Sequence, residues 1–227
     1  MLGSLPLDSD PRYPRRPAIA QQNRALVLHA QQRDTSESVL ASFGYAITTL
    51  EHVSAEDLPD RNYLLATIWT NVANVQVADG SDEALAHARR SATLAVSLVN
   101  GTEAIDTDHA EAGIKARHSL CRALLQSRRF ETAGTVEPVP ADVHQTTDMV
   151  DEALSLARSW DERGVTRFRA LAAELFRFGA FLYARYQPQF LDEFIAENVA
   201  PAKPSDFALS PEMKSAAADV ATLVSSA

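Results

Sequence analysis

The chain has few of the residues that form cross-links, tight turns or strands. Its single cysteine, Cys121, excludes an intramolecular disulfide and fits a reducing cytoplasm. With only 8 Gly among 227 residues and no alternating β-branched run bounded by turn dipeptides, a β-fold is not expected. No apolar stretch is long enough to span a bilayer, and the first 17 residues lack the apolar core of a signal peptide. A membrane partner is therefore not expected.

Positive charge is also scarce. The chain has 21 Lys and Arg against 30 Asp and Glu, which gives a net charge of −9. A negative field repels phosphate backbones, so nucleic acid is not an expected partner. Only Lys115, Lys203 and Lys214 are lysines, and this excess of Arg is typical of a GC-rich coding sequence. We therefore expect a protein of a bacterial-type cytoplasm.

Helix formers dominate what is present. Hydrophobic residues make up 46% of the chain, and apolar residues recur at helical spacing between Pro, Ser, Asp and Gly boundary signals. The sequence predicts nine helices, at residues 17–33, 36–53, 60–78, 82–99, 106–128, 144–160, 165–186, 188–199 and 211–225. Loops are predicted at 134–143 and 202–211. Residues 1–16 are expected to form a flexible tail, and 17–227 a single domain whose last helix caps one end.

The segment 64–99 carries the most informative pattern. Two apolar-periodic stretches meet at the turn signal of residues 79–82, as in a helical hairpin. Bulky and small residues then recur at Trp69, Val72, Ala73, Gly80, Ala84 and Ala88. This spacing resembles a tetratricopeptide repeat, although Gln76 replaces the family's Tyr and the closing Pro is missing.

Two further segments are similar to parts of that repeat, namely 120–133 and 175–182, with Phe43-Gly44 as a weaker match. The resemblance covers residues 35–199, and its bulky anchors lie 48 and 58 residues apart, whereas the family's period is about 34. It implies an all-α fold of antiparallel helical hairpins stacked as a short tetratricopeptide-like solenoid, a right-handed superhelix. A generic helical bundle is the alternative.

The resemblance also implies a function. In such repeats the first helix of each pair lines a concave groove that binds a peptide, so the chain is expected to be a non-catalytic protein-binding or peptide-binding module. The implied groove positions are Asn71, Asn74, Lys115, His118, Arg122, Phe176, Arg177 and Tyr183. Because this set is largely polar and basic, it suits an acidic or C-terminal carboxylate ligand. Asn71 and Lys115 match the subclass that clamps carboxylates, but Ser119 replaces its second basic residue.

The helix predicted at 165–186 is unusually aromatic. A stripe at spacings of three and four predicts a buried face, made of Phe168, Leu171, Leu175, Phe178 and Leu182. Phe176 and Tyr183 lie about a quarter turn away, which indicates a helix sandwiched between neighbours. Two alternatives use this region: a small-molecule sensor or enzyme with a pocket of Phe176, Phe181 and Tyr183, and a homo-oligomer joined through residues 176–194.

No motif for catalysis or metal binding stands out. The segment 106–118 contains His109, Glu111 and His118, but the two histidines are nine residues apart and point to opposite sides of a helix. Helix capping by Asp106 explains the acidic residues better. Cys121 lies mid-helix as a small hydrophobe. We therefore expect no catalytic residue, no metal and no cofactor.

Overall fold

The computed structural model describes residues 14–31, 36–104, 106–131, 140–199 and 211–225. These residues form nine α-helices and a short 3-10 helix, and no strand occurs among them. The helices are α1 (Arg15–Ala30), α2 (Ser36–Glu51), α3 (Arg61–Asp79), α4 (Asp82–Val99), α5 (Thr107–Glu131), α6 (Pro140–Glu162), α7 (Arg167–Tyr186), α8 (Leu191–Val199) and α9 (Pro211–Ser225), with η1 (Pro188–Phe190) before α8. The predicted all-α class and the number of helices are confirmed for this part of the chain.

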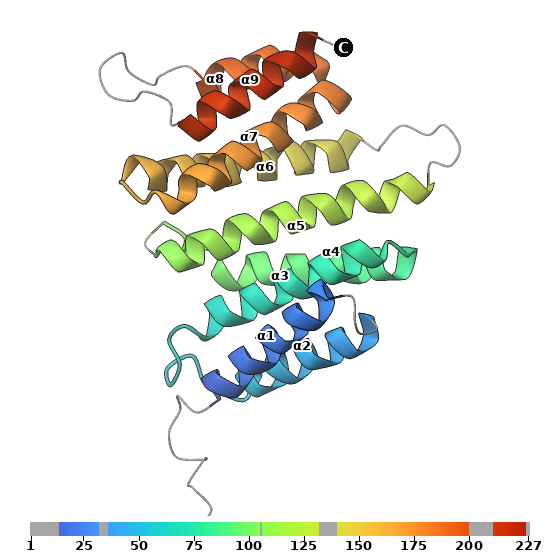
Figure 1. Cartoon of the computed structure of the whole chain (residues 1–227), viewed down its shortest axis with the longest axis vertical. Coiled ribbons are helices and arrows are strands. Elements are labelled where there is room, and N and C mark those ends of the chain that lie inside the picture. Colours follow the sequence, from blue (N-terminus) through green and yellow to red (C-terminus); the bar gives the residue numbers. More distant parts are fainter. Residues whose placement is uncertain (1–13, 32–35, 105, 132–139, 200–210, 226–227) are drawn as a thin grey trace, which may run out of the picture.

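The helices are stacked in chain order along the long axis of the molecule, from α1 and α2 at one end to α8 and α9 at the other (Figure 1). Successive helices pack as hairpins, α1 on α2, α3 on α4 and α5 on α6, while α7 contacts α6, α8 and α9. In addition, α5 packs on α3. Every described helix is too short or too polar to cross a lipid bilayer.

The α3–α4 turn follows from three adjacent residues. Gly80 ends α3 with a φ of 75°, a left-handed conformation that glycine adopts without steric cost. Ser81 is the N-cap of α4, and its hydroxyl oxygen accepts a hydrogen bond from the backbone N–H of Ala84 at 3.3 Å. The Ser81 hydroxyl in turn donates to a carboxylate oxygen of Asp79 at 2.7 Å. The turn predicted from the sequence is confirmed.

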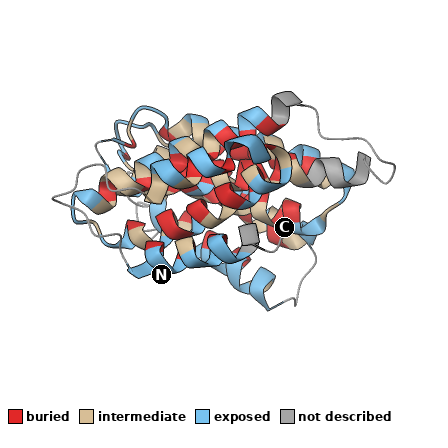
Figure 2. Ribbon diagram, turned by 90° about the horizontal axis from the view of Figure 1, so that it is seen from above, coloured by how far each residue is buried: buried red, intermediate tan, exposed pale blue. Residues whose placement is uncertain are grey.

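Small residues set the distance between the helices in the middle of the stack. Where α3, α4 and α5 meet, the buried alanines are Ala66, Ala73, Ala88, Ala92, Ala95, Ala112, Ala116 and Ala123. Because alanine side chains are small, the backbones of these helices can approach closely. The larger side chain of Trp69 is partly buried and packs against this cluster of small residues. Seen from above, the buried residues lie mainly on the inner sides of the helices, and the exposed residues lie mainly around the outside (Figure 2).

Aromatic side chains fill the core around α7. The predicted stripe is confirmed, with Phe168, Leu175 and Leu182 buried and Leu171 and Phe178 partly buried. A second face of α7 packs against α6 and α8, and there the ring of Phe176 stacks on that of Phe194. The prediction that α7 lies between neighbouring helices is therefore confirmed.

A buried ion pair lies at the connection between α4 and α5. Arg117 on α5 donates to the carboxylate of Glu103, and both residues are less than 10% exposed. The indole N–H of Trp160 donates to the backbone oxygen of Glu103 at 3.0 Å. Gly113 makes room for this cluster, because a Cβ at that position would lie 1.9 Å from a carboxylate oxygen of Glu103. The connection is thus fixed to both α5 and α6.

Two predicted boundaries are wrong. Residues 15 and 16 belong to α1 and not to a tail, because Pro14 already takes a helical conformation at the N-cap. Residues 140–143 belong to α6 and not to a loop. Pro140 occupies the first helical position, where a backbone N–H would have no hydrogen-bond partner within the helix, so proline is tolerated there. The remaining parts of these two predictions, 1–13 and 134–139, lie outside the described residues, as does most of the loop predicted at 202–211.

Candidate interaction surface

The polar residues predicted on α3 and α5 lie on two helices that pack on each other, and Asn74 and Arg122 are in contact. We call Asn71, Asn74, Lys115, His118 and Arg122 the α3–α5 face. Lys115, His118 and Arg122 recur at spacings of three and four on α5, so they share one side of that helix. Asn71 and Asn74 are three residues apart on α3 and are partly exposed.

A hydrogen-bond network joins the two helices of this face. The hydroxyl of Ser119 donates to the amide oxygen of Asn74 at 2.9 Å, and one guanidinium nitrogen of Arg122 lies 3.5 Å from the same oxygen. This contact of Arg122 is at the long limit of a hydrogen bond. No carboxylate of the described residues forms an ion pair with Arg122. Among the described residues its guanidinium therefore has the Asn74 amide, and no opposite charge, as its neighbour.

Lys115 differs from Arg122 in this respect. Its ammonium group lies 2.5 Å from a carboxylate oxygen of Glu111, one helical turn earlier on α5. Glu111 also lies 3.4 Å from Arg167 on α7, and Arg167 pairs with Asp108 at 2.7 Å. The charge of Lys115 is thus shared within a surface network of two acids and two bases.

His118 lies where α5 meets α7. Its ring contacts the ring of Phe178 edge-on, with centroids 4.9 Å apart, and one ring nitrogen lies 3.8 Å from a carboxylate oxygen of Glu174. Burial lowers the pKa of His118 below its usual value of 6.5; Glu174 opposes this shift and Arg122 adds to it. At neutral pH His118 is consequently uncharged, and Arg122 is the base of this face that no described carboxylate pairs with.

The three site residues predicted on α7 do not join this face. Phe176 is fully buried against Phe194, so its assignment to a groove is wrong. Arg177 turns toward α9, where it donates to Asp219 at 2.7 Å. The hydroxyl of Tyr183 donates to Asp151 on α6 at 2.7 Å. The physical reason is that α7 is covered on several sides, so its spacing alone does not tell which side faces the solvent.

The alternative aromatic pocket is not formed by these residues. Phe176 has no exposed surface, whereas Phe181 is 50% exposed. Tyr183 stacks on Phe194 at a centroid distance of 4.7 Å. Phe176 and Tyr183 thus pack together on Phe194, whereas Phe181 faces the solvent, and the three side chains do not line a common cavity.

Sequence reasoning missed two neighbours of the face, Glu174 and Phe178. Phe178 is predicted as a core residue, and it is partly buried against the cluster of Cys121, Val150 and Leu182. The signal that could have found both is their spacing, because residues 174, 178 and 181 recur along one side of α7. The helical spacing of both α5 and α7, taken together, would have predicted that His118 contacts the side of α7 that contains residues 174, 178 and 181.

The acidic start of α5 has a structural role. One carboxylate oxygen of Asp106 accepts the backbone N–H groups of Asp108 at 2.8 Å and of His109 at 2.9 Å. These backbone bonds, the largest contribution coming from His109, lower the pKa of Asp106. The predicted capping is confirmed. Within the described part of the chain, no three His, Cys, Asp or Glu side chains are grouped so as to hold a metal ion.

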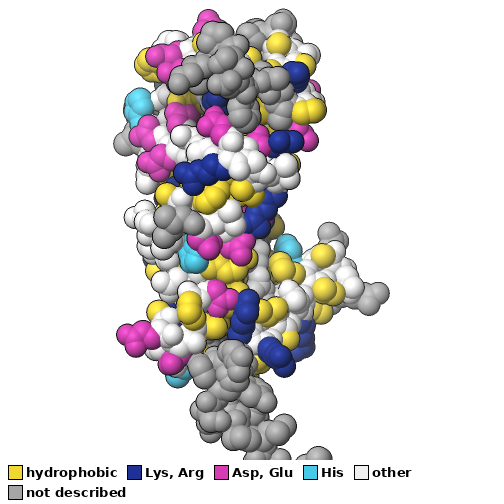
Figure 3. Space-filling model, turned by 90° about the vertical axis from the view of Figure 1, so that its left-hand side faces the viewer, with side chains coloured by type: hydrophobic (Ala, Val, Ile, Leu, Met, Phe, Trp, Pro, Cys, Tyr) yellow, Lys and Arg dark blue, Asp and Glu magenta, His cyan; other side chains and the backbone are white. Residues whose placement is uncertain are grey.

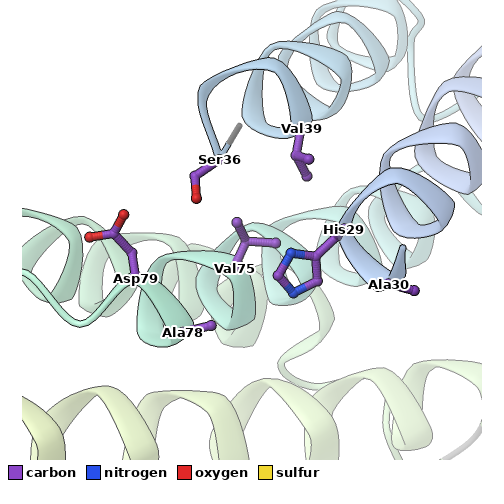
Figure 4. Close-up of a pocket in the computed structure, with 7 residues that line it drawn as sticks. All are labelled: His29, Ala30, Ser36, Val39, Val75, Ala78 and Asp79. Carbon is purple, nitrogen blue, oxygen red and sulfur yellow. The ribbon is translucent and has the colours of Figure 1, made fainter. Parts of the chain in front are cut away.

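A separate pocket lies between the end of α1, the start of α2 and the last turns of α3 (Figure 4). Its volume is about 500 Å³, and its lining consists of His29, Ala30, Ser36, Val39, Val75, Ala78 and Asp79. The carboxylate of Asp79 already accepts the hydrogen bond from Ser81, so it caps the turn. The pocket is open to solvent and brings together no set of reactive groups.

Comparison with known proteins gives little. No protein-family model matches the sequence, and no curated protein does either. One solved structure is similar, the crystal structure of a de novo designed helical repeat protein. It shares 18% sequence identity with this chain, the alignment covers 96% of this chain and 94% of that one, and the TM-score is 0.38. The likeness is too low to carry an argument, and the tetratricopeptide assignment stays a prediction.

Proposed function

We propose that this chain is a non-catalytic scaffold that binds a segment of another protein on the α3–α5 face. The single observation that supports this proposal is the environment of Arg122. Its guanidinium is held beside Asn74 at the junction of two helices, and no carboxylate of the described residues neutralises it. What distinguishes Arg122 is its place at the junction of α3 and α5, within reach of the Asn74 amide, on a chain of net charge −9.

The chemistry of the face selects an acidic ligand. A guanidinium offers five N–H donors in a planar arrangement that matches a carboxylate, and such charge-assisted pairs are about twice as strong as neutral hydrogen bonds. The amide oxygen of Asn74 is already used by Ser119, which leaves its amide nitrogen to donate to the same ligand. We propose that the ligand places an Asp, a Glu or a C-terminal carboxylate on Arg122 and Asn74.

The surrounding residues favour a peptide over a free anion. His118, one turn from Arg122 on α5, packs edge-on against Phe178, and the half-exposed Phe181 lies one turn further along the same side of α7. An apolar side chain next to the acidic one would pack there. The proposed ligand is thus an acidic segment with an apolar neighbour.

The absence of catalysis is part of the same proposal. The chain's single thiol is buried, and burial raises the pKa of Cys121 to about 12, so it does not form the reactive thiolate at neutral pH. The hydroxyl of Tyr183 is bonded to Asp151, and burial raises its pKa as well. Neither group is prepared to act as a nucleophile.

The proposal is tested by affinity capture from cells of the source organism with three baits: the native chain, Arg122→Glu and Arg90→Glu. Arg90 is an exposed arginine on α4, so Arg90→Glu changes the net charge equally at another place. Circular dichroism confirms that all three baits are equally helical. We expect a partner that the native chain and Arg90→Glu retain and that Arg122→Glu loses.

The captured partner is then divided into synthetic peptides, and binding is measured by fluorescence anisotropy. We expect an acidic peptide to bind the native chain at least tenfold more tightly than Arg122→Glu. A partner that all three baits retain equally, or one that binds through a basic segment, contradicts the proposal.

A further inference from the structure

Helix α1 is basic although the chain as a whole is acidic. It contains Arg15, Arg16 and Arg24 and no acidic residue. Arg15 pairs with Asp60 at 2.8 Å. Arg16 and Arg24 are exposed, and neither forms an ion pair with a described residue. Two positive charges on this helix are therefore not neutralised within the described chain.

The same side of α1 exposes apolar surface. Val27 on this side is 52% exposed, whereas Leu26, 36% exposed, lies about 100° away around the helix. At 100° per residue, Val27 lies angularly between Arg16 and Arg24, whereas the buried side of α1 lies opposite and packs on α2. Near the N-terminal end of the stack, Figure 3 shows basic side chains beside exposed hydrophobic ones. A surface with free cations around an apolar centre is typical of a binding site for another protein.

Helix α8 carries the complementary charge. Its exposed side contains Asp192, Glu193 and Glu197, it has no basic residue, and none of these carboxylates forms an ion pair with a described residue. The helix dipole explains acids in the first turn, which covers Asp192 and Glu193 but not Glu197 near the other end. Phe190, immediately before α8, is 43% exposed and adds an apolar group to this side.

The two surfaces lie at opposite ends of the stack (Figure 1). They are too distant to neutralise each other in one molecule, because exposed charges further apart than about 10 Å are largely screened. Two copies can bring them together. We infer that a second copy of this chain docks head to tail, with its α1 against the α8 of the first copy.

This arrangement differs from the expected oligomer joined through residues 176–194. It uses two different patches on each copy, so the contact is heterologous and leaves one free α1 and one free α8 on every pair. Association should then continue with concentration. Because the contact is largely ionic, salt should weaken it.

The first test measures the molar mass of the native chain by size-exclusion chromatography with light scattering over a concentration series. At low salt we expect a mass above that of one chain, rising with concentration. At about 1 M salt, where the Debye length is about 3 Å, we expect the mass of one chain. A single-chain mass at every concentration in low salt overturns the inference.

The second test uses charge reversal at each end. One variant carries Arg16→Glu and Arg24→Glu, and the other carries Glu193→Arg and Glu197→Arg, with helicity checked for both. Each variant alone then presents two ends of like charge and should have the mass of one chain. Mixed together they present opposite ends again, so association should return to at least half of the native level.

A matched control carries Arg90→Glu and Arg185→Glu, two exposed arginines on α4 and α7. It changes the net charge by the same amount as the α1 variant and should associate like the native chain. Association that persists in both end variants, or a mixture of folded variants that stays at the single-chain mass, overturns the inference. None of these substitutions touches the α3–α5 face, so this test and that of the proposed function are independent.

Discussion

The carboxylate of Glu103 lies directly against the backbone of Gly113, at the place where the side chain of any other residue at position 113 would begin. A Cβ there would be 1.9 Å from that carboxylate oxygen and 3.0 Å from the guanidinium of Arg117. The residue without a side chain is therefore what allows Glu103, in the α4–α5 connection, to form its buried ion pair with Arg117 on α5. This relationship leads to the first prediction.

Gly113→Ala should destabilise the protein although alanine is the better helix former. The added methyl group displaces Glu103 and leaves Arg117 buried without its partner. Complete loss of a buried ion pair destabilises a protein by about 3–5 kcal/mol. The higher helix propensity of Ala offsets about 1 kcal/mol of this loss. We expect a net loss of about 2 kcal/mol in the free energy of unfolding, measured with urea. Gly44→Ala on α2 is the control, because its Cβ would meet nothing within 4 Å, and it should stabilise the protein. Equal effects of the two substitutions would contradict this assignment.

Arg117 and Arg122 should respond differently to the same substitution. Arg117→Gln breaks a buried ion pair and should cost about 3–5 kcal/mol. Arg122→Gln removes a partly exposed guanidinium whose one hydrogen bond to the described residues is long, so the free energy of unfolding should change by less than about 0.5 kcal/mol. Urea unfolding monitored by circular dichroism measures both. A loss at Arg122 as large as that at Arg117 would make Arg122 a structural residue and would remove the main support for the α3–α5 face.

Asp151→Asn should stabilise the protein at neutral pH. One carboxylate oxygen of Asp151 accepts from Tyr183, but the other is buried without a hydrogen-bond partner among the described residues. Burial raises the pKa of Asp151 above 3.8, and Asp148 and Glu197 add to this while Tyr183 opposes it. A neutral amide removes the cost of burying that charge, and we expect a gain of about 1 kcal/mol at pH 7.

The pH dependence of this gain follows from the direction of the shift. The protonated form of Asp151 stabilises the fold; this contribution is complete below pH 3.8 and is lost as the pH rises through the higher pKa of the folded state. The advantage of Asp151→Asn should therefore shrink on acidification toward pH 3.8, as measured by urea midpoints at several pH values. Asp148→Asn, at an exposed position, is the control and should have little effect. An Asp151→Asn variant less stable than the native protein at pH 7 would refute the prediction.

Cys121 should not react in the native state. Its side chain is fully buried beside Val150 and Leu182, and burial raises the pKa of the thiol to about 12. At pH 8 the thiolate fraction is then about 10⁻⁴. In a thiol titration with a chromogenic disulfide, we expect one equivalent to react at once in denaturant and at least a hundredfold more slowly without it. Fast reaction under both conditions would show that the α5–α6–α7 interface is open.

The sequence predicted the helices better than the surface. Gly80, Ser81 and Asp106 mark helix ends through local hydrogen bonds and backbone conformation, which act within four residues and can be read directly. The errors at the starts of α1 and α6 involve Pro14 and Pro140, which fit the beginning of a helix as well as a loop.

The candidate site could be predicted only in part, for a physical reason. Because α5 packs on its neighbours through its apolar side, its polar residues share the other side. Lys115, His118 and Arg122 therefore lie on one side of the helix, as their spacing predicts. On α7 three sides are covered by other helices, and only the packing of Phe194 and Asp219 against it decides where Phe176 and Arg177 point. The spacing of residues along a sequence predicts which of them share one side of a helix, but it does not predict which other helix packs against that side.

The contacts around the α4–α5 connection have a consequence for how the molecule opens. In a simple stack each hairpin touches only the next, so local unfolding can start at either end and stop anywhere. Here Trp160, in the last turn of α6, donates to the backbone oxygen of Glu103, and Arg163, just after α6, donates to that of Ala104. These bonds join α6 to the α4–α5 connection. Amide hydrogens of α3 to α7 should therefore exchange with solvent as one cooperative unit, whereas those of α1, which packs almost entirely on α2, should exchange first.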